Sequence, residues 1–409
     1  MKRTGILFVV CAGVLGVATV AALLKSTPPA RAAAINPPVS SRSSPLPVRE
    51  VSGAAKTWHV PPAATGPRIQ VALLLDTSGS MDGLINQARS QLWAIVNDLL
   101  KATKDGKRPS LELALYEYGN PSRASSPTWI RQIAPFTDDL DGVSEALNAL
   151  TTAGGDEYCG EAIQHATNDL NWSTSEGDLK LIFIAGNEAF NQGFVNPVEA
   201  VRRAEGKGIT VNTVFCGDQR DGDAPGWKQG AVVANGRFLI INQNQAIVEV
   251  AAPQDAEIAE LGQKLNSTYV PYGATGSESF ERQAAQDRTS MGISRSNFAQ
   301  RTMTKGSRAY NNSGWDLVDA YEQKTVDVKQ MNDRDLPPEL KGKDAAEREQ
   351  WIAARKAERE RIQSRIRELS VAREKFVAQA HAATGAVTLD SAMIAALREE
   401  AKRARFEIE

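Results

Sequence analysis

Runs of uncharged, mostly branched residues alternate along the chain with stretches whose apolar residues recur at helical spacing. The clearest runs, RIQVALLLD, LELALYEYG and LKLIFIAG, predict buried strands, and TWIRQIA, GITVNTVFCG and GRFLIIN predict three more. Helices are predicted between them at Gly83–Lys101, Asp138–Leu150, around Gln164, Pro197–Glu205 and Asp255–Leu265. This alternation predicts an α/β fold, a doubly wound and mostly parallel sheet with helices on both faces. Such sheets place their binding sites at the carboxyl ends of the strands.

The pattern changes beyond Thr275. A main domain over residues 67–275 is therefore predicted to precede a C-terminal α-helical region over residues 276–409. The start of this region, residues 277–307, is polar and rich in small side chains. A short amphipathic piece follows around Trp315.

A long, highly charged helix is expected from Asp344 to Ala380, after the break LPPELKG. Its apolar residues form one narrow stripe, which Arg355 and Arg359 interrupt: Trp351, Ile362, Ile366, Leu369 and Phe376. The stripe has to pack against another surface. The candidates are the segment Ser391–Phe406 folded back as a hairpin, the flank of the main domain, or a partner helix in a coiled coil.

The amino terminus has the composition of an export signal. Lys2 and Arg3 precede an uncharged run, Gly5–Leu24, and small residues follow it. Residues 1–32 are predicted to be a signal peptide or an uncleaved membrane anchor, because the run is long for the first and just long enough for the second. Residues 33–66, rich in Pro, Ala and Ser, read as a flexible linker. The protein is therefore expected to be periplasmic, exposed on the cell surface, or anchored to the membrane.

One short turn carries the strongest chemical signal. Asp76, Ser78 and Ser80 directly follow the first strand in the sequence DTSGS. A carboxylate and two hydroxyls are hard oxygen ligands, which suit Mg²⁺ or Mn²⁺ better than zinc. The other interpretation is that these residues only cap the helix that follows.

With this D-x-S-x-S turn, the chain resembles the von Willebrand factor type A (VWA) domain from about Ile69 to about Tyr269. The resemblance implies that Asp76, Ser78 and Ser80 form the first loop of a metal-ion-dependent adhesion site. The stretches GGDEYCGEAI and IFIAGNEAF are also similar to those of a group of exported bacterial proteins with this domain, which implies no particular activity.

The second and third loops depart from the family pattern. Where the second loop normally has a threonine, this chain has Asp156 and Glu157, with Thr151 and Thr152 a few residues upstream. Where the third loop normally has an aspartate in T-D-G, the chain has Gly186, followed by the two further candidate ligands Asn187 and Glu188. Additional acids would make the site more tolerant of Ca²⁺. The alternative interpretation is that these acids are solvated loop residues and do not bind a metal.

Two cysteines lie beyond the export segment, Cys159 and Cys216. An even number in an exported chain favours a disulfide between them, which would stabilise the fold by about 4 kcal/mol. Two free, buried thiols are the alternative. The histidines show no zinc-ligand spacing with these cysteines.

Composition and motifs limit the function. The net charge of −2 in 409 residues argues against a nucleic-acid partner. The phosphate-loop, dinucleotide and H-E-x-x-H motifs are absent, and a hydrolase with Ser78 or Ser80 as nucleophile and His165 as base lacks the G-x-S-x-G elbow. A non-enzymatic protein-binding module is expected, which captures an acidic group of a protein partner through a divalent cation. The alternative is a structural envelope protein that assembles through its charged helical tail.

Overall fold

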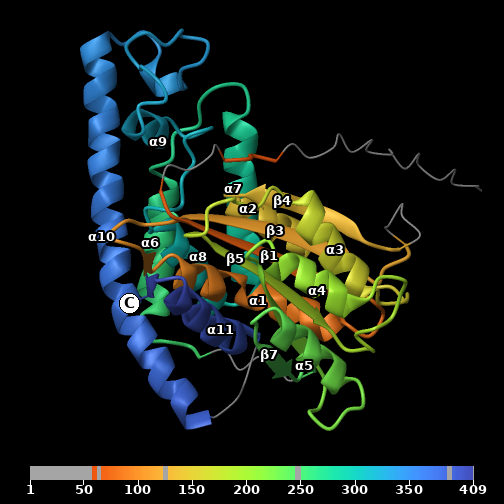
Figure 1. Cartoon of the computed structure of the whole chain (residues 1–409). Coiled ribbons are helices and arrows are strands. Elements are labelled where there is room, and N and C mark those ends of the chain that lie inside the picture. The colour runs from red at the N-terminus through yellow and green to blue at the C-terminus, as the bar shows by residue number, and fades with distance from the viewer. Residues whose placement is uncertain (1–57, 62–65, 123–127, 245–249, 385–388, 409) are drawn as a thin grey trace, which may run out of the picture. The chain divides into compact units, whose positions relative to one another are not determined.

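The computed structural model describes residues 58–61, 66–122, 128–244, 250–384 and 389–408 (Figure 1). They belong to one compact unit, Lys56–Glu409. The predicted signal peptide or anchor lies outside the described residues, as does the predicted linker except for residues 58–61 and 66. Among the described helices, none combines the length and the apolar character needed to cross a membrane.

A six-stranded sheet forms the centre of the fold, in the order β4-β3-β1-β5-β6-β7. All neighbouring strands are parallel except β3 and β4, which are antiparallel. The predicted mostly parallel α/β fold is thereby confirmed. The strands are β1 (Arg68–Asp76), β3 (Ser110–Tyr118), β4 (Arg131–Thr137), β5 (Leu179–Gly186), β6 (Thr210–Cys216) and β7 (Phe238–Ile241).

Alternating side chains of the strands build a separate core on each face of the sheet. On β1, Leu73 and Leu75 point into one core, and Ala72 and Leu74 point into the other. The first core includes residues of α1 (Asp82–Leu99) and α2 (Leu140–Asn148). The second includes residues of α3 (Cys159–Asp169), α4 (Pro197–Glu205) and α5 (Ala224–Val233). The sequence did not predict α5, whose ten residues include a proline and two glycines.

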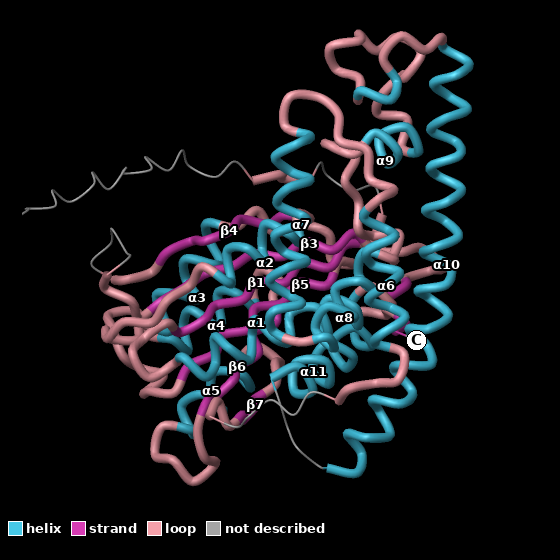
Figure 2. Tube along the Cα trace, turned by 180° about the vertical axis from the view of Figure 1, so that it is seen from behind, coloured by secondary structure: helices cyan, strands magenta, loops and turns pink. Residues whose placement is uncertain are grey.

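The chain beyond the sheet is helical, as predicted, but it contains two helices that the sequence did not indicate. These are α7 (Gly276–Ile293) and α8 (Arg295–Lys305). The other helices are α6 (Asp255–Asn266), α9 (Leu317–Glu322), η1 (Pro338–Leu340), α10 (Ala345–Thr384) and α11 (Leu389–Arg403). Both views show α10 running along one flank of the unit (Figures 1 and 2).

The apolar positions of α10 pack within the same chain. Ile362, Ile366 and Leu369 are buried, and α10 contacts α6, α8 and α9. The predicted position Phe376, in contrast, remains 38% exposed. Contacts within the chain therefore cover these three positions, and the coiled-coil alternative finds no support here.

The final helix, α11, was a predicted partner for the stripe of α10, but it packs mainly on α1 of the main domain. The Asp390 amide donates to Gln91 Oε1 of α1 at 2.9 Å. Arg398 of α11 forms an ion pair with Asp98 of α1. A two-stranded sheet of β2 (Ala102–Thr103) and β8 (Glu407–Ile408) follows these contacts.

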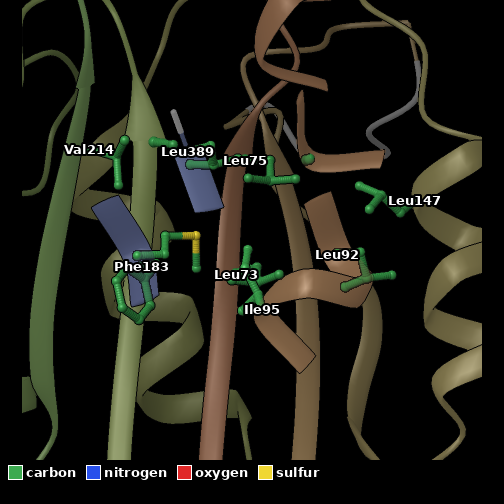
Figure 3. Close-up of a pocket in the computed structure, with 11 residues that line it drawn as sticks. Leu73, Leu75, Leu92, Ile95, Leu147, Phe183, Val214 and Leu389 are labelled. Carbon is green, nitrogen blue, oxygen red and sulfur yellow. The ribbon is translucent and has the colours of Figure 1, made fainter. Parts of the chain in front are cut away.

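A small apolar cavity of ≈ 20 Å³ lies between the sheet, α1 and α11. Figure 3 shows that its lining side chains come from strands and helices far apart in the sequence. They are Leu73, Leu75, Ala88, Leu92, Ile95, Leu147, Phe183, Ala185, Val214, Leu389 and Met393. A cavity of this size has room for about one small group.

Residues 58–61, at the end of the predicted linker, lie against the main domain. His59 Nδ1 is 2.6 Å from Asp138 Oδ1, and Thr137 Oγ1 donates to the His59 carbonyl at 2.5 Å. Trp58 packs against the first core. The packed part of the chain thus includes these residues.

Candidate metal centre

Three neighbouring strands of the sheet end at the same edge. β1 ends at Asp76, β3 at Tyr118 and β5 at Gly186. The parallel register places Asp76 beside Tyr118, and Leu75 beside Ala185. This edge is where an open parallel sheet places a binding site.

Two carboxyl groups are buried together at this edge. Asp76 is 0% exposed and Glu157 is 1% exposed. A Cβ atom added to Gly119, which has φ +78°, would lie 2.9 Å from Asp76 Oδ1 and 3.4 Å from Glu157 Cγ. Glycine at position 119 therefore leaves space for both acidic side chains.

Three of the four carboxyl oxygens have no hydrogen-bond partner among the described residues. The Ser78 amide donates to Asp76 Oδ1 at 2.7 Å, but Asp76 Oδ2 and both Glu157 oxygens are unpartnered. Burial, and then the neighbouring Glu157, raise the pKa of Asp76 well above its ordinary value, and burial raises the pKa of Glu157. An unpaired buried carboxylate is costly, so the pair fits a cation that would bind these oxygens.

The serines and Asn187 add neutral oxygens beside this pair. Ser78 is buried, and its Oγ lies 3.4 Å from Ser80 Oγ. Ser80 Oγ donates in turn to Asn187 Oδ1 at 3.3 Å. The first and third predicted loops therefore meet. All these oxygens are hard ligands of the kind that Mg²⁺, Mn²⁺ and Ca²⁺ prefer.

The other two predicted acids point elsewhere. Asp156 is exposed and accepts a hydrogen bond from Tyr158 Oη at 3.1 Å. Glu188 is also exposed and accepts from Gln192 Nε2 at 2.6 Å. Of the two threonines upstream, Thr151 is exposed and Thr152 Oγ1 donates to Asp82 Oδ1 at 2.5 Å. Within the described residues, no group of three or more His, Cys, Asp or Glu side chains is arranged to hold a metal.

Gly186 occupies the family's aspartate position because the space beside it is already filled. A Cβ atom there would collide with Tyr118 Oη and lie 3.0 Å from the Trp227 ring and 3.2 Å from Asp76 Oδ2. Tyr118 is held in place, since its Oη donates to the Ala185 carbonyl at 2.8 Å. Sequence reasoning missed Tyr118 and Trp227 because both read as ordinary core aromatics.

The predicted disulfide is wrong in this structure, where Cys159 and Cys216 are both free and buried. Cys159, at the start of α3, lies in one core, and Cys216, at the end of β6, lies in the other. The sheet therefore separates the two sulfurs. Burial also raises the pKa of both thiols well above the ordinary value.

Comparison with known proteins identifies the domain. Residues 70–225 match the profile of the von Willebrand factor type A domain. A search of curated proteins gave no match.

Three solved structures illustrate the similarity of this chain to known folds, each with a low TM-score over the whole chain. Conserved hypothetical protein BatB from Bacteroides thetaiotaomicron is 17% identical over 42% of this chain and 90% of its own, with a TM-score of 0.33. A von Willebrand factor type A protein from Catenulispora acidiphila is 17% identical over 44% of this chain and 39% of its own, with a TM-score of 0.33. Proximal thread matrix protein 1 from the mussel byssus, with a zinc-occupied MIDAS motif, is 12% identical over 42% of this chain and 41% of its own, with a TM-score of 0.32.

The order of the strands and the D-x-S-x-S turn at the end of β1 agree with the profile match. VWA domains are commonly protein-interaction modules, and some carry a metal-ion-dependent adhesion site. This chain contains a von Willebrand factor type A domain over residues 70–225.

Proposed function

We propose that the chain is an exported or membrane-tethered protein-binding module, without enzymatic activity, that engages an acidic group of a partner through a divalent cation. Asp76, Ser78, Ser80 and Glu157 would hold the ion, with Asn187 at its rim. The observation that carries the proposal is the buried Asp76–Glu157 pair, whose unpartnered oxygens lie next to the serine turn. Mg²⁺ is the expected ion, with Mn²⁺ or Ca²⁺ as alternatives.

The surrounding residues orient the two acids. The Ser78 amide fixes Asp76 through its bond to Oδ1. Gln192 holds the second loop against the third, because its Oε1 accepts from Glu157 N at 3.1 Å while its Nε2 donates to Glu188. When bound, the ion supplies positive charge to the partner's acidic group. Glu188 is exposed in the third loop. Its negative charge would attract positively charged groups of a partner and repel negatively charged ones.

Thermal unfolding with and without MgCl₂ or MnCl₂ tests the site. The wild type should be stabilised by about 2.7 kcal/mol when the free ion is at a hundredfold excess over Kd. Asp76→Asn and Glu157→Gln should abolish this stabilisation, and both should fold because each removes a buried charge. Asp156→Asn is the matched control, since that acid is exposed and bonded to Tyr158. Equal stabilisation of all four proteins would contradict the assignment.

Two further experiments test the partner and the location. Envelope proteins captured by the wild type in MgCl₂ should be lost with Asp76→Asn or with a chelator. Capture that is retained in both cases would contradict metal-dependent binding.

Residues 1–66 fused to a reporter that is active only after export should give activity if this segment is an export signal or anchor. An inactive, intracellular fusion would exclude that role.

A further inference from the structure

Three aromatic side chains from three different loops meet close to the candidate metal centre. The Trp129 and Tyr158 rings are stacked, with centroids 5.8 Å apart and an interplanar angle of 8°. The Phe194 ring meets Tyr158 edge-on, at 6.0 Å and 62°. Trp129, Tyr158 and Phe194 are called the aromatic corner below. Phe194 is 89% exposed, so the corner opens to solvent.

Buried contacts hold the backbone that carries this exposed ring. Phe194 N and Val195 N both donate to Glu161 Oε1, at 2.6 and 3.0 Å, and Glu161 itself is only 4% exposed. On the opposite side, Trp129 has a φ of +52°, a conformation that is costly for a bulky residue. An exposed aromatic ring maintained by buried contacts, next to a strained tryptophan, is suited to binding a ligand rather than to stabilising the fold.

The charge around the corner selects a positive ligand. Tyr158 Oη donates to the exposed Asp156, and the buried Glu161 Oε2 has no hydrogen-bond partner in the part of the chain that the structure describes. Asp156, Glu157, Glu161 and Glu188 lie in the loops and the helix start at this edge of the sheet, whereas Glu176 and Asp178 directly precede β5 at the opposite edge. Lys180 donates to the carbonyls of Ser173 and Lys207, near the amino-terminal end of β5 and not at the corner. Arg131, two residues from Trp129, is paired with Glu117 at 2.7 Å.

We propose that the aromatic corner binds a lysine or arginine side chain of the protein partner. A cation over aromatic rings is attracted to their faces, and the neighbouring carboxylates strengthen this attraction. The same loops carry Tyr158 beside Glu157, and Phe194 after Asn187 and Glu188. The inference therefore rests on the proposed function for the face that the partner approaches: the partner segment would present a basic side chain to the corner and an acidic one to the ion.

A random-peptide display library, selected on the full chain in MgCl₂, supplies the probe. Peptides selected on the wild type should be enriched in lysine and arginine, and those selected on Phe194→Ala should not. An enriched peptide should bind the wild type about 3- to 10-fold more tightly than its Arg→Gln counterpart. With Phe194→Ala this difference in affinity should vanish, because the Phe194 ring that the arginine contacts is absent. Val232→Ala, which truncates another exposed apolar side chain, is the control and should behave as the wild type.

The outcomes separate this inference from the metal site. Absence of basic enrichment on the wild type, or an Arg→Gln loss of equal size on the wild type and on Phe194→Ala, would overturn the proposal. Enrichment of apolar residues that depends on Phe194 would also overturn it and indicate an apolar ligand. Selection on Asp76→Asn tests the proposed function alone: acidic enrichment should disappear while basic enrichment remains. If acidic enrichment is unchanged there, the metal grip fails and the aromatic corner stands.

Discussion

Arg301 of α8 donates to Asp141 of α2 at 2.6 Å, although 160 residues separate them in the sequence. Arg301 is 0% exposed and also donates to Asp287 of α7 at 2.6 Å. Tyr310 Oη donates to the second oxygen of Asp141 at 2.7 Å. Buried charges thus join the C-terminal helices to the helices that cover the sheet.

Arg301→Met should destabilise the protein by about 3–5 kcal/mol, because Asp141 and Asp287 would lose a buried partner. Arg365→Met is the control, since Arg365 forms an exposed ion pair with Glu257, and its loss should leave stability unchanged. Urea unfolding of the full chain measures both effects. Equal stabilities of the two variants would show that the Arg301 network contributes nothing.

Asp319 should make stability depend on pH. Burial, and then the neighbouring Asp316, raise its pKa to about 6, from an ordinary value of 3.8. Between these values the folded state binds a proton that the unfolded state has lost, so the free energy of unfolding should fall as pH rises from about 4 to 6. Asp319→Asn cannot titrate and should show a smaller fall over this range. Parallel slopes for wild type and variant, measured by denaturant unfolding at several pH values, would refute this origin.

Val214→Ile should stabilise the fold by about 0.8 kcal/mol, because one added methylene would enter the apolar cavity in Figure 3. Val211→Ile is the matched control on the same strand. Val211 is 0% exposed, lies in the opposite core and does not line the cavity, so an added methylene there should overpack and destabilise. A lower melting temperature for Val214→Ile would contradict the prediction.

Gly186→Asp, which restores the family's usual acid, should not improve the metal centre. Its side chain would press on Tyr118 and on the Trp227 ring, so a cost of about 1–3 kcal/mol is expected. Gly186→Asp combined with Tyr118→Phe, which removes the colliding hydroxyl, should recover part of that stability. Thermal unfolding and Mg²⁺ titration decide the matter, and tighter ion binding by the single variant would disprove the steric explanation.

The two buried thiols should be unreactive in the folded protein. In a Cys11→Ser background, Cys159 and Cys216 should label only after denaturation, and should do so without any reductant. Burial keeps both thiols protonated as well as inaccessible. Mass spectrometry after alkylation gives the count, and a need for reductant before labelling would restore the disulfide.

The centre of the sheet was predictable because β1, β3, β5 and β6 are almost entirely buried. Two mostly apolar runs predict strands directly, and they coincide with β1, RIQVALLLD, and β5, LKLIFIAG. The helix α8 was not predictable from apolar spacing, since its buried face includes Arg301 and Lys305. A polar network of this kind resembles a solvated loop in the sequence, and only the partners at Asp141 and Asp287 show that it is core.

The candidate site was predictable in part. The D-x-S-x-S turn identifies Asp76, Ser78 and Ser80, but sequence order alone could not distinguish Glu157 from Asp156. Adjacent residues in a loop point in different directions, and the backbone decides which one reaches Asp76. The same limitation explains the error over the cysteines, because the alternation of side chains along β6 assigns Cys216 to the opposite face from Cys159.

The pairing of Ala102 with Ile408 in β2 and β8 has a consequence for biosynthesis. A ribosome adds roughly 5–20 residues per second, so α1 would wait on the order of half a minute for the segment that covers it. During that interval the apolar residues of α1 that α11 later covers would be exposed to solvent. A chaperone that binds the unfolded chain, or a translocation machinery that delays folding, would be needed until α11 and β8 have been synthesised.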